Sequence, residues 1–192
     1  MDWKKNIRRI LEAAAQLKQT RPLFHLVLTG QGADMEAIRE MAHDLGLGEH
    51  AVLTGHVGST EELDALYKAA SLFVFPSLYD TFSLVVREAA AMGTPSVVVR
   101  GSCASESIQD QHNGFLCEDD TNDLCRVIEA ALGDPNHTRK VGEAARQTIP
   151  VTWEEVMAEV ISRYEALIAA HKPRKRIPAA RRHLENSKRK NL

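Results

Sequence analysis

The chain has 192 residues, of which 44% are hydrophobic and 5% aromatic, and its formal net charge at pH 7 is −2. This length allows one domain of ordinary size with a buried core. No apolar run approaches the roughly 20 residues that span a bilayer, and the charged N-terminus is unlike a signal peptide. Three cysteines without Cys-x-x-Cys spacing indicate reduced thiols in a cytoplasmic protein and argue against a disulfide framework or a zinc site.

Alternating apolar runs and helical patterns divide the chain in order. The patterns predict helices at 3–19, 33–45, 61–70, 82–92, 122–132, 136–148 and 153–171, and strands at 24–28, 51–53, 72–75, 96–99 and 115–116. Strands that alternate with helices of this length indicate an α/β fold, a Rossmann-like three-layer domain with a parallel sheet flanked by helices, over residues 1–171. Such a domain normally opens on a strand, whereas this pattern opens on a helix. The first strand of the sheet is therefore expected to be missing.

Charge is distributed unevenly along the chain. Residues 172–192 hold nine of the 24 Lys and Arg residues and one of the 26 Asp and Glu residues, so this segment carries +8 and the remainder −10. The pattern predicts a disordered basic tail that either aids solubility or contacts an anionic membrane surface, placing the protein at the inner membrane face. Nucleic acid is disfavoured as a partner, because the body is acidic and no aromatic residue lies among the basic ones.

The most informative stretch is residues 75–99, FPSLYDTFSLVVREAAAMGTPSVVV. It places Asp80 in the loop after a strand and Glu88 two turns into the following helix. Ligands of open α/β sheets bind at this carboxyl edge. The free N–H groups of Phe82, Ser83 and Leu84 at the helix start are expected to attract phosphate. Amides that bind phosphate beside carboxylates that accept hydroxyls suit a nucleotide sugar as the ligand.

Together with LVLTGQG (26–32), LTGHV (53–57) and NGFL (113–116), this stretch resembles the C-terminal, donor-binding domain of retaining glycosyltransferases. These are the two-domain GT-B enzymes of the group-one, or family-four, class, and the resemblance extends from about Lys4 to His171. The carboxylate pair with seven residues between, followed by Gly-Thr-Pro, is the specific part of the match.

The resemblance implies roles for individual residues. Glu88 matches the glutamate that binds the donor ribose, and Asp80 matches an acidic residue, usually Glu, that faces the donor sugar. Lys5 matches the lysine that neutralises the leaving diphosphate, although the arginine that accompanies it in the family has no counterpart in this sequence. The implied catalytic residues are Asp80 and Lys5, and the implied donor-binding residues are Glu88, Phe82, Ser83, Leu84, Gly30, Gly32 and Val57.

The implied reaction transfers a hexose from a nucleotide sugar, expected to be UDP-linked, to a lipid or polysaccharide acceptor with retention of configuration. Lysine and helix-end amides can stabilise the leaving diphosphate, so no metal or other cofactor is expected. The acceptor would be held by a missing N-terminal domain, and the chain alone is not expected to transfer sugar. Two alternatives stay open: a non-catalytic α/β binding module with Asp80 as a surface carboxylate, and the donor half of a nucleotide-sugar epimerase.

Overall fold

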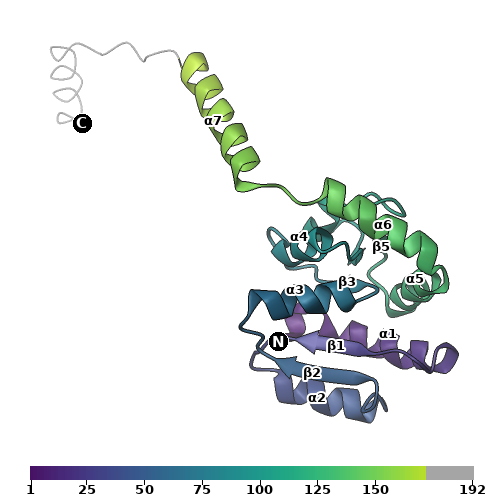
Figure 1. Ribbon diagram of the computed structural model, residues 1–192. Helices are drawn as coiled ribbons and strands as arrows, with labels where there is room; N and C mark the ends of the chain where they lie inside the picture. The colour runs from purple at the N-terminus through teal and green to yellow at the C-terminus, as the bar shows by residue number, and fades with distance from the viewer. Residues whose placement is uncertain (172–192) are drawn as a thin grey trace, which may run out of the picture. The chain divides into compact units, whose positions relative to one another are not determined.

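The computed structural model describes residues 1–171, and the basic segment 172–192, for which the sequence predicts a membrane-contacting tail, lies outside the described residues. Contacts divide the chain into one unit at Met1–Pro150 and a second that starts at Val151. In the first unit, helices and strands alternate as the sequence predicts (Figure 1). The strands are β1 (Leu26–Thr29), β2 (Ala51–Gly55), β3 (Phe73–Phe75), β4 (Ser96–Val99) and β5 (Phe115–Cys117). The helices are α1 (Ile7–Thr20), α2 (Met35–Asp44), α3 (Thr60–Ala69), α4 (Leu84–Ala91), α5 (Thr121–Gly133) and α6 (Pro135–Thr148), with 3₁₀ turns at Trp3–Lys5 and Cys103–Ser107.

All strand pairs are parallel, which confirms the predicted α/β class. The strands form two sheets, however, where the sequence predicts one. β1 pairs with β2, and β3, β4 and β5 form the other sheet in the order β3-β4-β5. β4 lies in the middle of the larger sheet, and its four residues, Ser96 to Val99, are all buried. This explains why Val97, Val98 and Val99 form a continuous apolar run and do not alternate with polar residues.

Helix α1 packs against both sheets. Ala13 and Leu17 belong to a cluster with residues of β4, β5 and α5, whereas Leu11 and Ala14 pack with residues of β1 and α2. The first predicted helix is interrupted at Asn6, which has a left-handed backbone with φ 60°. Asparagine tolerates this region better than most residues. The Asn6 Nδ2 group donates a hydrogen bond to the Pro76 carbonyl oxygen at 3.1 Å, so the kink fixes the start of α1 beside the end of β3.

Helix α6 approaches the α4–β4 turn very closely at Gly142. A Cβ atom at this position would overlap the carbonyl oxygen of Gly93 and lie 3.1 Å from the Pro95 ring. Val141 and Ala145 on either side of it are buried. Glycine is therefore required here by the neighbouring backbone, and the contact holds the C-terminal part of this unit against the loop that follows α4.

The second unit contains α7 (Trp153–Ala170), close to the predicted range. Its start carries a capping box, in which Thr152 accepts from the Glu155 N–H and Glu155 accepts from the Thr152 N–H. Within residues 1–171, no helix is both long enough and apolar enough to cross a membrane.

Candidate functional site

Lys5 and Asp80, 75 residues apart in the sequence, meet at the carboxyl end of β3. The Lys5 Nζ atom lies 2.8 Å from Asp80 Oδ2, and it also lies 5.7 Å from the centre of the Phe75 ring. The Asp80 side chain is 18% exposed and that of Lys5 is 44% exposed. The structure therefore brings together the two residues that the resemblance assigns to catalysis.

The second carboxylate oxygen of Asp80 accepts hydrogen bonds from backbone amides at the start of helix α4. Oδ1 accepts the Ser83 N–H at 2.8 Å and the Phe82 N–H at 3.3 Å. Ser83 is buried and has a left-handed backbone with φ 49°, a conformation that costs free energy for a residue with a Cβ. The expectation of three free amides at this helix start is thus wrong for Phe82 and Ser83, because an internal carboxylate already occupies them. Leu84, the first residue of α4, has a side chain exposed to solvent.

The surroundings of Asp80 shift its titration. The hydrogen bond from Lys5, followed by those from the Ser83 and Phe82 amides, holds the pKa of the Asp80 carboxyl below its usual range. A lowered pKa in the folded state stabilises the fold at neutral pH, and that stabilisation is lost as the pH falls below about 4.

Replacement of Lys5 by glutamine should show how much the Lys5–Asp80 ion pair contributes to the stability of the fold. We expect the free energy of unfolding to fall by about 0.2–1 kcal/mol at pH 7, the range for a partly exposed ion pair. The difference from the parent should become smaller as the pH falls below about 4 and Asp80 takes up its proton. Urea unfolding at pH 7 and pH 3 measures it, with Lys68→Gln on α3 as the matched control. A loss of stability that is equal at both pH values would contradict the pairing.

Glu88, on helix α4, is hydrogen-bonded to helix α3. Its Oε2 atom accepts the Tyr67 hydroxyl of α3 at 3.3 Å, and Glu88 itself is exposed. Burial, and then the charge of Glu88, raise the pKa of Tyr67, so this hydroxyl stays protonated and donates. Tyr67 orients the carboxylate while leaving it accessible to a ligand hydroxyl. Tyr67 was not predicted as a site residue, because the sequence around it shows only the periodicity of a helix.

The remaining predicted residues lie in loops that follow β1 and β2. Gly30 directly follows β1, has φ +130°, and donates to the Gly55 carbonyl oxygen at 2.7 Å. Gly32 lies against the backbone of Met1. Val57 is half-buried in the loop between β2 and α3. These loops follow the carboxyl ends of their strands, as Asp80 does.

The sequence analysis singled out the backbone amide of Phe82, but it did not reveal the position of the Phe82 ring. Its ring is 59% exposed, and the Arg87 guanidinium lies 4.9 Å from the ring centre. Arg87 also donates to the Ile149 carbonyl oxygen at 2.7 Å, which fixes its position. The cation–π contact with Arg87 holds an exposed aromatic ring next to Asp80.

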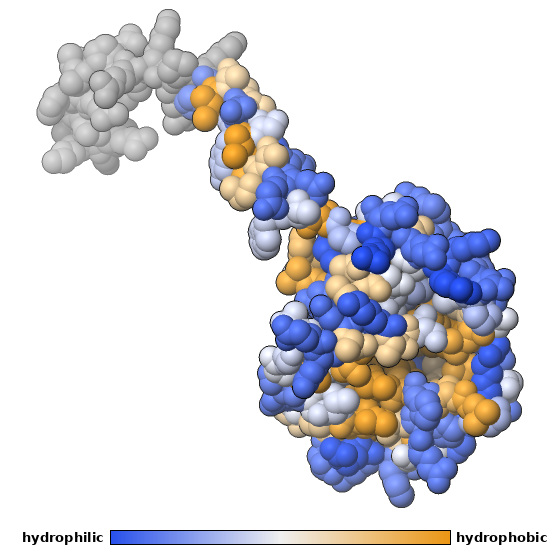
Figure 2. All heavy atoms as spheres, viewed as in Figure 1, coloured by the Kyte–Doolittle hydropathy of each residue, from blue (hydrophilic) through white to orange (hydrophobic). Residues whose placement is uncertain are grey.

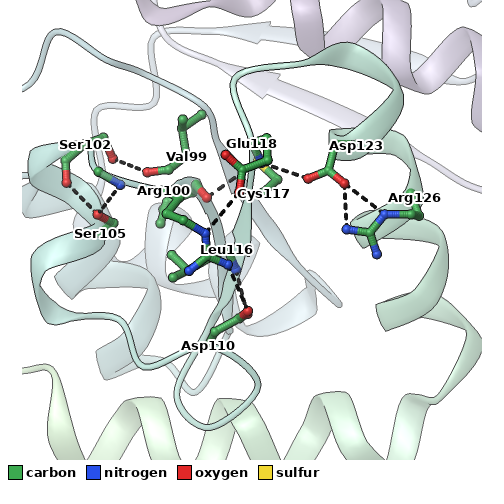
Figure 3. Close-up of polar contacts among 12 residues, drawn as sticks. Val99, Arg100, Ser102, Ser105, Asp110, Leu116, Cys117, Glu118, Asp123 and Arg126 are labelled. Atoms are coloured by element: carbon green, nitrogen blue, oxygen red, sulfur yellow. Dashed lines mark hydrogen bonds and ion pairs between the residues drawn. The ribbon is translucent and has the colours of Figure 1, made fainter.

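A second polar cluster lies at the carboxyl ends of β4 and β5 (Figure 3). Arg100 bridges two carboxylates, with Nη2 3.3 Å from Asp110 Oδ2 and Nε 3.1 Å from Glu118 Oε1. Asp123 accepts the Glu118 N–H at 2.7 Å and pairs with Arg126. These residues line a cavity of ≈220 Å³. Because its charged groups are paired with one another, we interpret the cluster as a structural contact that holds together the loops after β4 and β5.

Known proteins resemble this chain over most of its length. Residues 1–148 match the family described as Glycosyl transferases group 1. The glycogen synthase of Mycobacterium tuberculosis is 28% identical over 182 residues, which are 93% of this chain and 44% of that protein. The GDP-mannose-dependent alpha-mannosyltransferase of Corynebacterium glutamicum is 30% identical over 148 residues, 76% of this chain and 34% of that protein.

The fold agrees with these matches. The solved structure of sucrose-phosphate synthase from Thermosynechococcus elongatus superposes with a TM-score of 0.78 at 29% identity, covering 88% of this chain and 44% of that one. The chain thus spans less than half the length of these relatives. The parallel α/β architecture and the Asp80–Glu88 stretch are accounted for by one family, and the chain belongs to the group 1 glycosyl transferases.

Proposed function

We propose that this chain binds the nucleoside diphosphate sugar donor of a glycosyltransferase that retains the configuration of the transferred hexose. The observation that carries the proposal is the convergence of the Lys5 ammonium and two backbone amides on a single anion, the Asp80 carboxylate. Ammonium groups and helix-start amides are also the donors that bind phosphate. The names of the relatives, a glycogen synthase and a mannosyltransferase, support sugar transfer as the reaction class.

In the proposed complex, the diphosphate takes over the hydrogen-bond donors that otherwise bind Asp80. Lys5 then neutralises the negative charge that grows on the diphosphate as its bond to the sugar breaks. Asp80, once released, faces the sugar ring, on which positive charge develops. Glu88 accepts the ribose hydroxyls in an orientation set by Tyr67. The loops under the donor and the base would contain Gly30, Gly32 and Val57.

Transfer itself is proposed to require more than these residues. The relatives are more than twice as long as the part that this chain matches. We therefore expect acceptor binding to need a further domain, and the 192-residue chain to bind donor weakly without transferring sugar. The acceptor expected from the sequence is a lipid or a polysaccharide. A membrane contact of residues 172–192 stays a prediction, because these residues lie outside the described part of the chain.

The melting temperature of the 192-residue chain, with and without nucleotides, tests donor binding. A ligand that binds the folded state at ten times its dissociation constant stabilises that state by about 1.4 kcal/mol. We expect UDP and UDP-glucose to raise the melting temperature, and we compare them with GDP, GDP-mannose and ADP at millimolar concentration. A shift with GDP alone would mean that the donor carries guanine and not uracil, as the name of the Corynebacterium relative would favour. A chain that none of them stabilises would contradict donor binding.

Donor binding should not depend on a metal ion, because Lys5 and the helix-start amides supply the positive charge. The nucleotide-induced rise in melting temperature is therefore expected to be the same, within error, in millimolar EDTA and in millimolar Mg²⁺. Loss of the shift in EDTA would show that the diphosphate is held through a metal.

A non-catalytic binding module is the second candidate, and one observation favours it. Both Asp80 oxygens have partners within the protein, as expected of a carboxylate that only stabilises a helix start. The two candidates differ in how inorganic pyrophosphate should change the melting temperature. A donor site should bind pyrophosphate through Lys5, so pyrophosphate should raise the melting temperature of the parent chain but not that of Lys5→Gln. If Asp80 only stabilises the helix start, pyrophosphate should leave the melting temperature of both chains unchanged.

A further inference from the structure

In the part of the chain that the structure describes, strand β5 is the last strand of the larger sheet. The order of this sheet is β3-β4-β5, so β4 covers one edge of β5 and the other edge faces outward. The Cys117 carbonyl oxygen accepts the Arg100 N–H, so Cys117 directs its backbone groups toward β4. Because successive residues of a strand alternate in this direction, the backbone groups of Leu116 and Glu118 point outward. An outward edge of this kind is a template for a strand of another molecule.

Side chains of the same chain already occupy this edge. The Leu116 N–H donates to Asp110 Oδ1 at 2.9 Å. The Glu118 N–H donates to Asp123 Oδ2 at 2.7 Å. Figure 3 shows the two carboxylates approaching from different elements, Asp110 from the loop before β5 and Asp123 from helix α5. Their oxygens therefore lie where the carbonyl oxygens of a neighbouring strand would accept these amides.

Each carboxylate is also held by an arginine at its second oxygen. Asp110 Oδ2 lies 3.3 Å from Nη2 of Arg100, and Asp123 Oδ1 lies 2.6 Å from Nη2 of Arg126. The Glu118 N–H, and then Arg126, hold the pKa of the Asp123 carboxyl below its usual range, so this carboxyl is charged at neutral pH. Hydrogen bonds to a charged acceptor are stronger than those to a neutral carbonyl oxygen. A second strand would therefore have to displace the stronger acceptors.

The side chains at this edge form only a small apolar patch. Leu116 is half-buried, and together with the buried Phe115 and Val127 it lines the cavity of ≈220 Å³. Helix α6 contributes His137, whose ring contacts that of Phe115. The surface over α6 is mainly hydrophilic in Figure 2, which has the view of Figure 1. Backbone pairing would thus supply much of any contact between this edge and a further strand.

The strand that matches this edge is β5 of a second copy. A two-fold axis through an antiparallel strand pair brings an edge onto itself, so both copies use the same surface. Leu116 of each copy would then lie opposite its counterpart, and the two half-buried side chains would cover one another. The same approach brings the Asp110 and Asp123 carboxylates of both copies together, and like charges repel.

We propose that Asp110 and Asp123 close the outward edge of β5 against strand pairing with a second copy of this chain. The two carboxylates act in place of a further strand, because they satisfy the outward amides of Leu116 and Glu118 and repel the same groups of an approaching copy. Their removal is expected to open the edge to self-association. This role is separate from donor binding, to which neither aspartate is assigned.

Amide hydrogen exchange of Leu116, measured by NMR in dilute and in concentrated samples of the 192-residue chain, tests this proposal. In the dilute double variant Asp110→Ala/Asp123→Ala, this amide is expected to exchange about tenfold faster than in the parent, because its acceptor is gone. At millimolar concentration it should regain protection, and sedimentation velocity should show a species of twice the mass relative to the parent. The control, Glu129→Ala/Glu143→Ala, changes the net charge equally and should exchange like the parent at both concentrations.

Each other outcome counts against the proposal. A Leu116 amide that exchanges equally fast in dilute and concentrated samples of the folded double variant would mean that the open edge does not pair. Protection that does not fall in the dilute double variant would mean that the carboxylates are not what covers this amide. Association that the control variant shares would place the contact elsewhere in the chain. If circular dichroism shows that the double variant does not fold, Asp110→Ala alone is measured in the same way, because it opens the Leu116 amide by itself.

Discussion

Replacing Gly142 by alanine is expected to destabilise the chain by about 3 kcal/mol, the upper part of the usual range for overpacked sites. The added Cβ atom would overlap the Gly93 carbonyl oxygen, and Pro95 leaves no room on the other side. Backbone atoms in a turn cannot move aside as a side chain can. The better helix propensity of alanine, worth about 1 kcal/mol, offsets only part of this cost. Urea unfolding followed by far-UV circular dichroism measures the loss.

Gly48→Ala is the matched control, because a Cβ there would meet no atom within 4 Å and the backbone at Gly48 does not have positive φ. Its free energy of unfolding should stay within about 0.5 kcal/mol of the parent. If Gly142→Ala were as stable as Gly48→Ala, α6 would not approach the Gly93–Pro95 turn as closely as described.

Replacing Glu88 by alanine is expected to weaken binding of the donor nucleotide by about 1–3 kcal/mol, or roughly 5- to 150-fold, the range for a polar partner left without its hydrogen bond. The reason is loss of the acceptor for the ribose hydroxyls. Calorimetric titration with the nucleotide that gives the melting shift measures it. Asp80→Asn, by contrast, should not weaken nucleotide binding in this chain, because it removes a carboxylate that the diphosphate would otherwise displace from Lys5.

Two further variants separate a ribose contact from a structural effect of Glu88. Glu143→Ala removes an exposed carboxylate from α6 and should leave the affinity unchanged. Tyr67→Phe removes only the hydroxyl that orients Glu88, so it should weaken binding less than Glu88→Ala does. If the nucleotide bound Glu88→Ala as well as the parent, the assignment of Glu88 to the ribose would be wrong.

The elements that were predictable from the sequence are those whose signals are local. Ser96–Val99 is a strand because four apolar or small residues lie between Pro95 and a glycine turn, and Ser59 caps α3 by accepting from Glu62, as its position before an acidic turn indicates. The α/β class followed from the alternation of such signals. The family followed from the spacing of Asp80 and Glu88 and the residues around them.

The parts that were missed depend on contacts between distant residues. Asn6 interrupts the first helix because its amide reaches Pro76, 70 residues away. The separation into two sheets depends on which strands become neighbours, and strand patterns do not record this. Asp80 occupies the amides of Phe82 and Ser83 through the choice of a rotamer, and no periodicity reveals a rotamer. The roles of Asp80, Glu88 and Lys5 in sugar transfer stay predictions.

The packing of α1 against both sheets has a thermodynamic consequence. A two-stranded sheet is only marginally stable in water by itself, so β1 and β2 depend on the helices packed against them. Because α1 shares its buried face between both hydrophobic clusters, a fluctuation that loosens this helix removes support from both at once. Residues 1–150 are therefore expected to lose their structure in a single cooperative transition, with α1 as the element that couples the two halves.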